Sequence, residues 1–154
     1  MNATSARPPR GKKFFTVSDA NRMLPLIRAV VRDMIKIAQE ATQLQENLTG
    51  LSGKRKEADN TRHQLGADLE AMVEKWENHR QELRDLGVEF KGAGTEGLVD
   101  FPAWVNGREV ELCWKFDEPD VSHWHELFVG FAGRQPISTL ETELAAETNL
   151  ANTK

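Results

Sequence analysis

The hydrophobic positions in the first half of the chain repeat with the period of an α-helix. Between residues 24 and 48 apolar side chains recur at alternating steps of three and four, the pattern of a helix that buries one seam. A second stripe runs beside the first at Val30, Ile37, Leu44 and Leu51. So wide an apolar face is typical of a helix packed against more than one element, so we expect a partner in the β region or in a second subunit.

A capping box and a proline indicate where this helix begins. Thr16 is followed three residues later by Asp19, a spacing typical of a helix N-terminus. Pro25 has no backbone N–H and disfavours helical geometry at Leu24. The sequence therefore predicts a short helical segment from Thr16, a break at Leu24 and Pro25, and a long helix after the break.

A second helical pattern follows a polar turn in residues 50–60. Its apolar positions again step by four and three from Leu65 to Leu86, and Gly87 suits the left-handed residue that ends many helices. Two helices with heptad spacing and a short connection form an antiparallel pair. We therefore expect a long, coiled-coil-like helical hairpin over residues 16–86.

After Gly87 the period shortens towards two, which indicates β-structure in residues 88–137. Asn106-Gly107 is the dipeptide most typical of a two-residue hairpin turn, and Val110, Leu112 and Trp114 alternate with polar residues after it. Pro102 cannot donate to a ladder, which places the first hairpin strand at an edge or over a bulge. The expected fold class is α+β, mainly α, with a small antiparallel sheet after the helical hairpin.

Composition limits the domain organisation and the cellular setting. The 154 residues fit one domain over residues 14–137, with a flexible basic arm at 1–13 and an acidic tail at 138–154 that is either a marginal helix or disordered. A net charge of −4 gives no general attraction to nucleic acid, and the basic arm is the one feature that favours such binding. A single cysteine and the lack of a signal or membrane-spanning run predict a cytoplasmic protein of bacterial type.

Acidic residues and histidines crowd into residues 117–126. If residues 122–126 are extended, His123 and His125 point to the same side, as a facial metal site requires; in a helical turn they diverge, and the sequence leaves both open. Glu118, His123 and His125 are weak candidates for metal ligands. Because no HExxH or paired-cysteine spacing accompanies them, we predict no cofactor and keep a divalent metal as the alternative.

Two further features are candidates for chemistry. A glycine-bracketed turn in residues 130–133 presents backbone N–H groups beside Arg134, which suits a carboxylate or phosphate, or Arg134 binds a scaffold carboxylate such as Asp100 or Glu118. Cys113 should lie on the side of its strand opposite Leu112. A nucleophilic cysteine needs a histidine within hydrogen-bond reach, so we interpret Cys113 as a packing residue.

The segments FTVSDANRMLPLI, GVEFK, GLVDFPA, GREVELCW, EPDVSHWHE and GFAGRQP resemble, in this order, an uncharacterised prokaryotic family called domain of unknown function 2203. The resemblance covers roughly residues 14–137 and implies a cytosolic single-domain protein, with no activity to carry over. His123 lies outside the family's pattern, which favours His125 as the single candidate. The matching residues are Asp100, Phe101, Pro102, Gly107, Arg108, Cys113, Trp114, Glu118, Trp124, His125, Gly133, Arg134 and Pro136.

Two functions of different classes follow from these patterns. The first is a non-enzymatic structural or interaction module that self-associates as a homodimer through the wide apolar face of the first helix. The second is a protein that binds a small molecule or a metal, and that acts as an enzyme in one version of this hypothesis. Its expected ligand-binding residues are Asp100, Trp114, Glu118, Trp124, His125 and Arg134.

Overall fold

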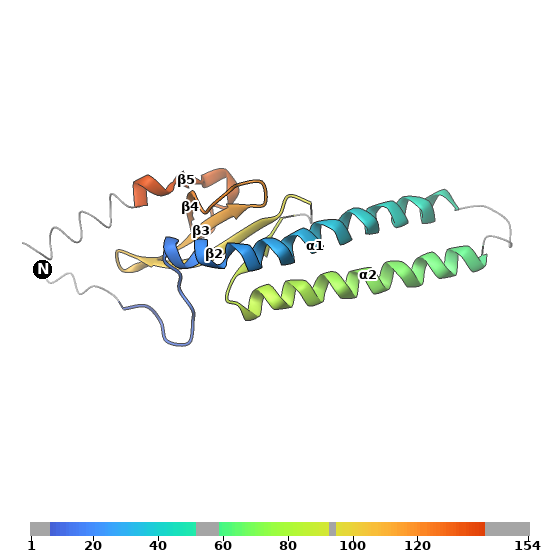
Figure 1. The fold of residues 1–154 in the computed structure, drawn as a ribbon, viewed down its shortest axis with the longest axis horizontal. Helices are drawn as coiled ribbons and strands as arrows, with labels where there is room; N and C mark the ends of the chain where they lie inside the picture. The colour runs from blue at the N-terminus through green and yellow to red at the C-terminus, as the bar shows by residue number, and fades with distance from the viewer. Residues whose placement is uncertain (1–6, 52–58, 93–94, 141–154) are drawn as a thin grey trace, which may run out of the picture.

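The computed structural model describes residues 7–51, 59–92 and 95–140, which form two long helices and one sheet (Figure 1). Helix α1 spans Val17–Gly50 and helix α2 spans Asp59–Asp85. The sheet contains β1 (Glu89–Lys91), β2 (Leu98–Val105), β3 (Arg108–Lys115), β4 (His123–Glu126) and β5 (Gln135–Pro136), and a short 3-10 helix, η2 (Phe131–Gly133), precedes β5. The predicted class, α+β and mainly α, is confirmed.

Helix α1 begins at the predicted capping box but does not break at Pro25. The Asp19 N–H donates to Thr16 Oγ1 at 3.0 Å, and the Thr16 N–H donates to the Asp19 carboxylate at 3.4 Å. The predicted break at Leu24 and Pro25 is wrong, because Pro25 lies inside one continuous helix. Leu24 and Ile27 are buried on either side of the exposed Pro25, and this packing outweighs the one backbone hydrogen bond that the proline removes.

The two halves of α1 have different surroundings. The first half packs on the sheet, where Ile27, Val30, Val31 and Met34 are buried in the same core as β2 and β3. Within the described part of α1, no residue after Met34 is buried. The wide apolar face predicted from the sequence thus contacts the β region over the first half of the helix.

Among the described residues, the second half of α1 packs mainly against α2, and the two helices project together from the sheet as a hairpin (Figure 1). Gly87 ends this hairpin as predicted: its φ is +92°, its N–H donates to the Arg84 carbonyl at 2.9 Å, and the Val88 N–H donates to the Leu83 carbonyl at 3.1 Å. Within the described residues, neither helix has a stretch apolar enough to span a membrane.

The sheet is antiparallel, and its strands lie side by side in the order in which they occur along the chain. Asn106 and Gly107 both have positive φ, +53° and +76°, and they form the predicted tight turn between β2 and β3. Although β2 is an inner strand, β1 pairs only with Leu98, Val99 and Asp100. Pro102 lies beyond that pairing, so β2 is locally at an edge where the proline occurs.

Both ends of the described chain are attached to the sheet region. Lys12, in the predicted flexible arm, forms a 2.9 Å ion pair with Glu109, and residues 1–6 of that arm lie outside the described residues. At the other end residues 137–140 are helical, and Ile137 and Leu140 are buried in the core. The domain therefore continues to Leu140 because this apolar side chain completes the core, whereas residues 141–154 of the predicted tail lie outside the described residues.

Candidate functional site

The two faces of the sheet have opposite character. Val99, Phe101, Val110, Leu112 and Trp114 belong to the core that packs on α1, and the residues that alternate with them point to the other face. On that other face the strand register aligns Asp100 with Cys113, Cys113 with His123, and Glu111 with His125. Ionisable side chains from three neighbouring strands are thus collected on one face.

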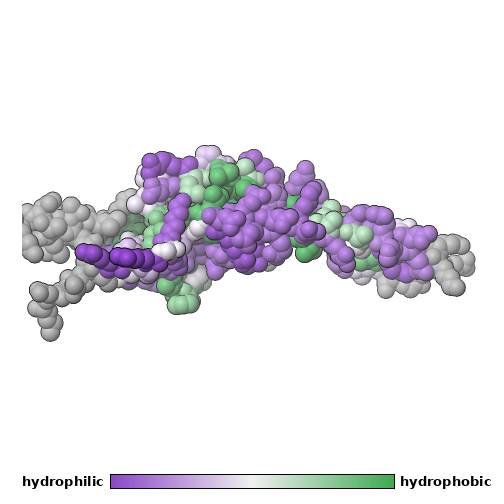
Figure 2. Space-filling model, turned by 90° about the horizontal axis from the view of Figure 1, so that it is seen from below, coloured by the Kyte–Doolittle hydropathy of each residue, from purple (hydrophilic) through white to green (hydrophobic). Residues whose placement is uncertain are grey.

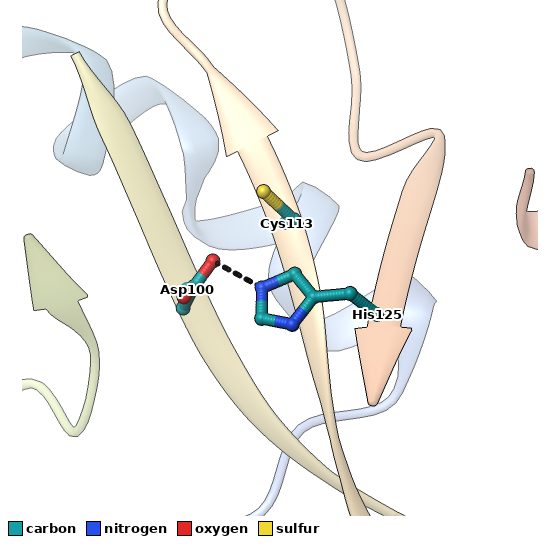
Figure 3. A group of neighbouring side chains, drawn as sticks. All are labelled: Asp100, Cys113 and His125. Carbon is teal, nitrogen blue, oxygen red and sulfur yellow. Dashed lines mark hydrogen bonds and ion pairs between the residues drawn. The ribbon is translucent and has the colours of Figure 1, made fainter. Parts of the chain in front are cut away.

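Asp100 and His125 form a buried pair at the centre of this polar face (Figure 3). The residues are 5% and 4% exposed, and His125 Nε2 lies 3.2 Å from Asp100 Oδ1. The other ring nitrogen, Nδ1, lies 2.8 Å from the backbone carbonyl of Glu126. Both ring nitrogens therefore face acceptor oxygens, whereas a neutral imidazole has a single N–H.

Cys113 stands beside this pair on the central strand, β3 (Figure 3). Ligand atoms of Asp100, Cys113 and His125 all lie within 4.8 Å of one another, and all three residues are buried. Burial, and then the Asp100 carboxylate, raise the pKa of the Cys113 thiol to about 12. The thiol is therefore protonated near neutral pH and is a poor nucleophile as it stands.

A cavity of about 320 Å³ lies over the polar face. Asp100, Glu111, Cys113 and His125 line its polar side, together with Lys91. Burial, followed by the Asp100 carboxylate, raises the pKa of Glu111 to about 6. The remaining lining residues are mostly apolar: Leu98, Leu127, Phe128, Gly130 and Phe131. The cavity thus combines carboxylates and a lysine with apolar lining residues.

The apolar side contains unusually exposed residues. Phe128 is fully exposed and has a positive φ of +69°, a backbone conformation that is uncommon for a bulky residue. Phe131 is 49% exposed. Exposed aromatic side chains on a strained loop are costly unless they serve an interaction, so this loop belongs to the candidate site.

Glu118 and Arg134, two of the predicted site residues, bind each other beside the cavity instead of lining it. The Arg134 guanidinium forms an ion pair with Glu118 and donates to the Cys113 carbonyl at 3.1 Å. Glu118 also accepts the Lys115 N–H at 2.7 Å and lies 3.3 Å from His123 Nδ1. Of the alternatives for Arg134, the geometry matches the scaffold carboxylate, because the pair fastens the segment before β5 to β3.

The remaining predicted residues are distributed differently from the sequence hypothesis. Trp114 and Trp124 point into the core on the opposite face, where their indole N–H groups donate to the Glu118 carbonyl and to Thr139. His123 and His125 do share one face of extended β4, which settles the conformation that the sequence left open. Glu118 and His123 lie together, whereas His125 pairs with Asp100, so the three predicted metal candidates do not form one group.

Sequence reasoning predicts two residues of the cavity only in part. Cys113 lies on the side opposite Leu112, as expected, and its burial agrees with the predicted packing role, whereas the sequence predicts no role for Glu111. The available signal was the alternation in β3, which gives Glu111 and Cys113 the same side. The missing information was the register that brings Asp100 and His125 to that side.

Comparison with known proteins identifies a family but supplies no function. A family model described as "Uncharacterized conserved protein (DUF2203)" matches residues 13–137. Neither the curated proteins nor the solved structures contain a match. The matched segment includes α1, α2 and all five strands, and with them every residue of the polar face described above. On this match over most of its length, the chain belongs to the DUF2203 family of uncharacterized conserved proteins.

Proposed function

We propose that this protein binds a cationic ligand in the cavity over the polar face of the sheet. The observation that carries the proposal is that Asp100 and Glu111 line one cavity and that, within the described residues, no lysine or arginine forms an ion pair with either carboxylate, although His125 contacts Asp100 and Lys91 also lines the cavity. Carboxylates withdrawn from water are costly unless a positive charge accompanies them. A cation in the cavity supplies that charge.

A purely structural role for the buried Asp100–His125 pair explains less of the geometry. Buried ion pairs stabilise proteins little in comparison with apolar side chains of similar size, so stability alone does not account for them. The pair also opens onto a cavity with exposed Phe128 and Phe131 on its other side. Polar groups converging in a largely apolar hollow are typical of ligand sites.

The test is a titration with a fixed panel of probes, the organic cations benzylamine and agmatine and the ions Zn²⁺ and Mg²⁺, followed by amide chemical shifts. We expect at least one probe to shift signals of β2, β3 and β4 around the cavity, and Asp100→Asn to weaken that binding by about tenfold or more, since it removes a charge-assisted contact. Glu70→Gln, an exposed site on α2, is the matched control and should bind like wild type. Probes that leave the cavity signals unmoved, or an Asp100→Asn variant that binds equally well, contradict the proposal.

Self-association is a second candidate function, and the projecting hairpin favours it. Ile37, Ala38, Ala41, Met72, Val73 and Trp76 line an apolar groove between α1 and α2. Figure 2 shows apolar patches interrupting the hydrophilic surface along the hairpin. We propose a second copy of this chain as the partner, since two hairpins packed together bury both grooves in the manner of a four-helix bundle.

The state of the single cysteine bears on where the protein works. Cys113 is free and buried, and the chain has no second cysteine with which to form an internal disulfide. Free thiols persist in reducing compartments. We therefore propose a cytoplasmic location, where the Cys113 thiol on the polar face stays reduced.

A further inference from the structure

Three side chains on the polar face offer three different kinds of ligand atom. Asp100 on β2, Cys113 on β3 and His125 on β4 contribute an oxygen, a sulfur and a nitrogen, all within 4.8 Å of one another. Around a tetrahedral zinc ion with bonds of about 2.0–2.3 Å, ligand atoms lie roughly 3.5 Å apart. Asp100 lies directly opposite Cys113, and His125 lies diagonally across from Cys113 on β4, so side-chain rotations can bring the three ligand atoms closer together.

The orientation of His125 suits a metal ligand. In ligating histidines one ring nitrogen commonly donates to a backbone carbonyl or a carboxylate, which fixes the ring and turns the other nitrogen's lone pair to the metal. His125 Nδ1 lies 2.8 Å from the Glu126 carbonyl, and Nε2 points towards Asp100 and the cavity. When the Nδ1 proton is donated to the Glu126 carbonyl, the Nε2 lone pair is available to a cation held between it and Asp100.

A nucleophilic cysteine is the competing reading of the same residues, and the geometry disfavours it. Such a cysteine needs a histidine that accepts its proton. Within the described residues no hydrogen bond joins Cys113 to His125, whose two nitrogens are directed at Glu126 and Asp100. Burial and the neighbouring Asp100 carboxylate raise the pKa of the thiol, which disfavours the nucleophilic thiolate. The group is better suited to hold an ion than to attack a substrate.

We propose that Asp100, Cys113 and His125 bind a divalent transition-metal ion of the zinc class, with at least one coordination position open to the cavity. The proposal rests on the proposed cation-binding function and specifies its ligand. A donor set of one thiolate, one imidazole and one carboxylate favours zinc-like ions over Mg²⁺ and Ca²⁺, which take oxygen ligands. On binding, the thiol gives its proton to solvent and the thiolate sulfur bonds the metal.

The open coordination position of the proposed metal ion faces the cavity. The cavity is lined by the three ligand residues and also by Leu127, Phe128 and Phe131, of which both phenylalanines are exposed to solvent. Three protein ligands with a free position facing a cavity are the arrangement of metal sites that bind water or substrate, whereas purely structural zinc sites have four protein ligands. A ligand reaching the metal from this side would carry an apolar group against the aromatic wall.

The experiment uses full-length protein without a histidine tag, stripped with a chelator and titrated with Co²⁺ as a spectroscopic substitute for zinc. We expect a near-ultraviolet thiolate-to-cobalt charge-transfer band that saturates at equimolar metal and disappears when Zn²⁺ displaces the cobalt, whereas Mg²⁺ leaves it unchanged. Cys113→Ser should abolish the band. Asp100→Asn and His125→Gln should weaken binding by more than the ~10–100-fold typical of losing an outer-shell contact. His123→Gln, on the same face but outside the ligand set, should bind like wild type.

The wild-type cobalt spectrum tests the metal site even if a variant fails to fold. Circular dichroism shows whether each variant is folded. Equimolar cobalt binding without a charge-transfer band, no saturable binding, or a band that survives in Cys113→Ser overturns the metal site. If benzylamine or agmatine binds the cavity while cobalt does not, the proposed cation-binding function stands and the metal inference falls. If none of these probes binds there, both fall.

Discussion

Glu111 is a carboxylic acid in an unfavourable place, half buried on β3 with Asp100 and His125 near it. Loss of solvation and then repulsion from the Asp100 carboxylate raise its pKa from 4.5 to about 6, while His125 and Lys91 act in the opposite direction. A residue that costs stability when charged is typical of a functional site, where a position is optimised for binding and not for folding.

Glu111→Gln should therefore stabilise the protein at high pH and have little effect at low pH. Because the folded-state pKa is raised, the folded protein binds more protons than the unfolded chain between pH 4.5 and about 6, so stability falls as pH rises through that window and stays lower above it. After allowance for solvent screening at this partly exposed group, we expect a gain of about 1 kcal/mol for the variant at alkaline pH.

Urea unfolding of wild type and Glu111→Gln at about pH 4 and about pH 8 measures this difference, since both pKa values lie between these limits. Glu70→Gln on α2 is exposed and should show no such pH dependence. A Glu111→Gln variant with the same stability difference from wild type at both pH values would show that the environment of Glu111 is not destabilising.

The elements were largely predictable where local chemistry decides them. The capping pair Thr16 and Asp19, the terminating Gly87 and the turn at Asn106-Gly107 each appear in the structure as expected, because each depends on a few neighbouring residues. The continuity of α1 through Pro25 was not predictable in this way. The helix is kept continuous by tertiary packing of the neighbouring side chains against the sheet, and a local sequence pattern does not contain that information.

The candidate site was predictable only in part, because it depends on register between strands. The sequence identified Asp100 and His125, but it grouped them with Glu118 and Arg134, which bind each other. Alternation assigns a side chain to a face, but the partner across the strand is set by the whole sheet. Cys113 enters the site through pairing with Asp100, which the residues around Cys113 do not encode.

Gly97 lies directly before β2, where the chain passes close to α1, and substitution there should be strongly destabilising. Its φ is +66°, and a Cβ there would lie 2.6 Å from Phe116 Cβ and 3.1 Å from both Ile35 and Val31. Gly97→Ala should therefore cost about 3 kcal/mol, from left-handed strain and from overpacking together. Gly66→Ala, in the open interior of α2, should instead stabilise by about 1 kcal/mol.

Chemical unfolding of the two alanine variants beside wild type provides the measurement. The two variants are informative together because both add one methyl group. Opposite changes in the free energy of unfolding would therefore reflect the backbone conformation and the free volume at each position. A Gly97→Ala variant as stable as wild type would mean that α1 and the sheet do not approach as closely as the structure places them.

At the scale of the whole molecule the chain separates into a sheet-bearing body and a projecting hairpin (Figure 1). The body has a continuous core shared by α1 and the sheet. The distal hairpin has only two helices, and beyond Met34 the described residues of α1 are at best half buried. Two helices alone bury little apolar surface, so the hairpin is the part of the molecule that gains most from a second copy.

Val73→Arg tests this proposal, because Val73 is 53% exposed and lines the apolar groove of the hairpin. A charged side chain in a dimer interface should weaken association by roughly thirtyfold, or about 2 kcal/mol, as measured by sedimentation equilibrium over a range of micromolar concentrations. Leu26→Arg is the matched control, equally exposed at 53% but on the first half of α1, and it should leave the dimer intact. The cobalt spectrum of Val73→Arg should match wild type, because the groove and the polar face have no residue in common. A wild-type protein that sediments as a monomer throughout, or two variants that dissociate equally, would exclude the hairpin groove as the dimer interface.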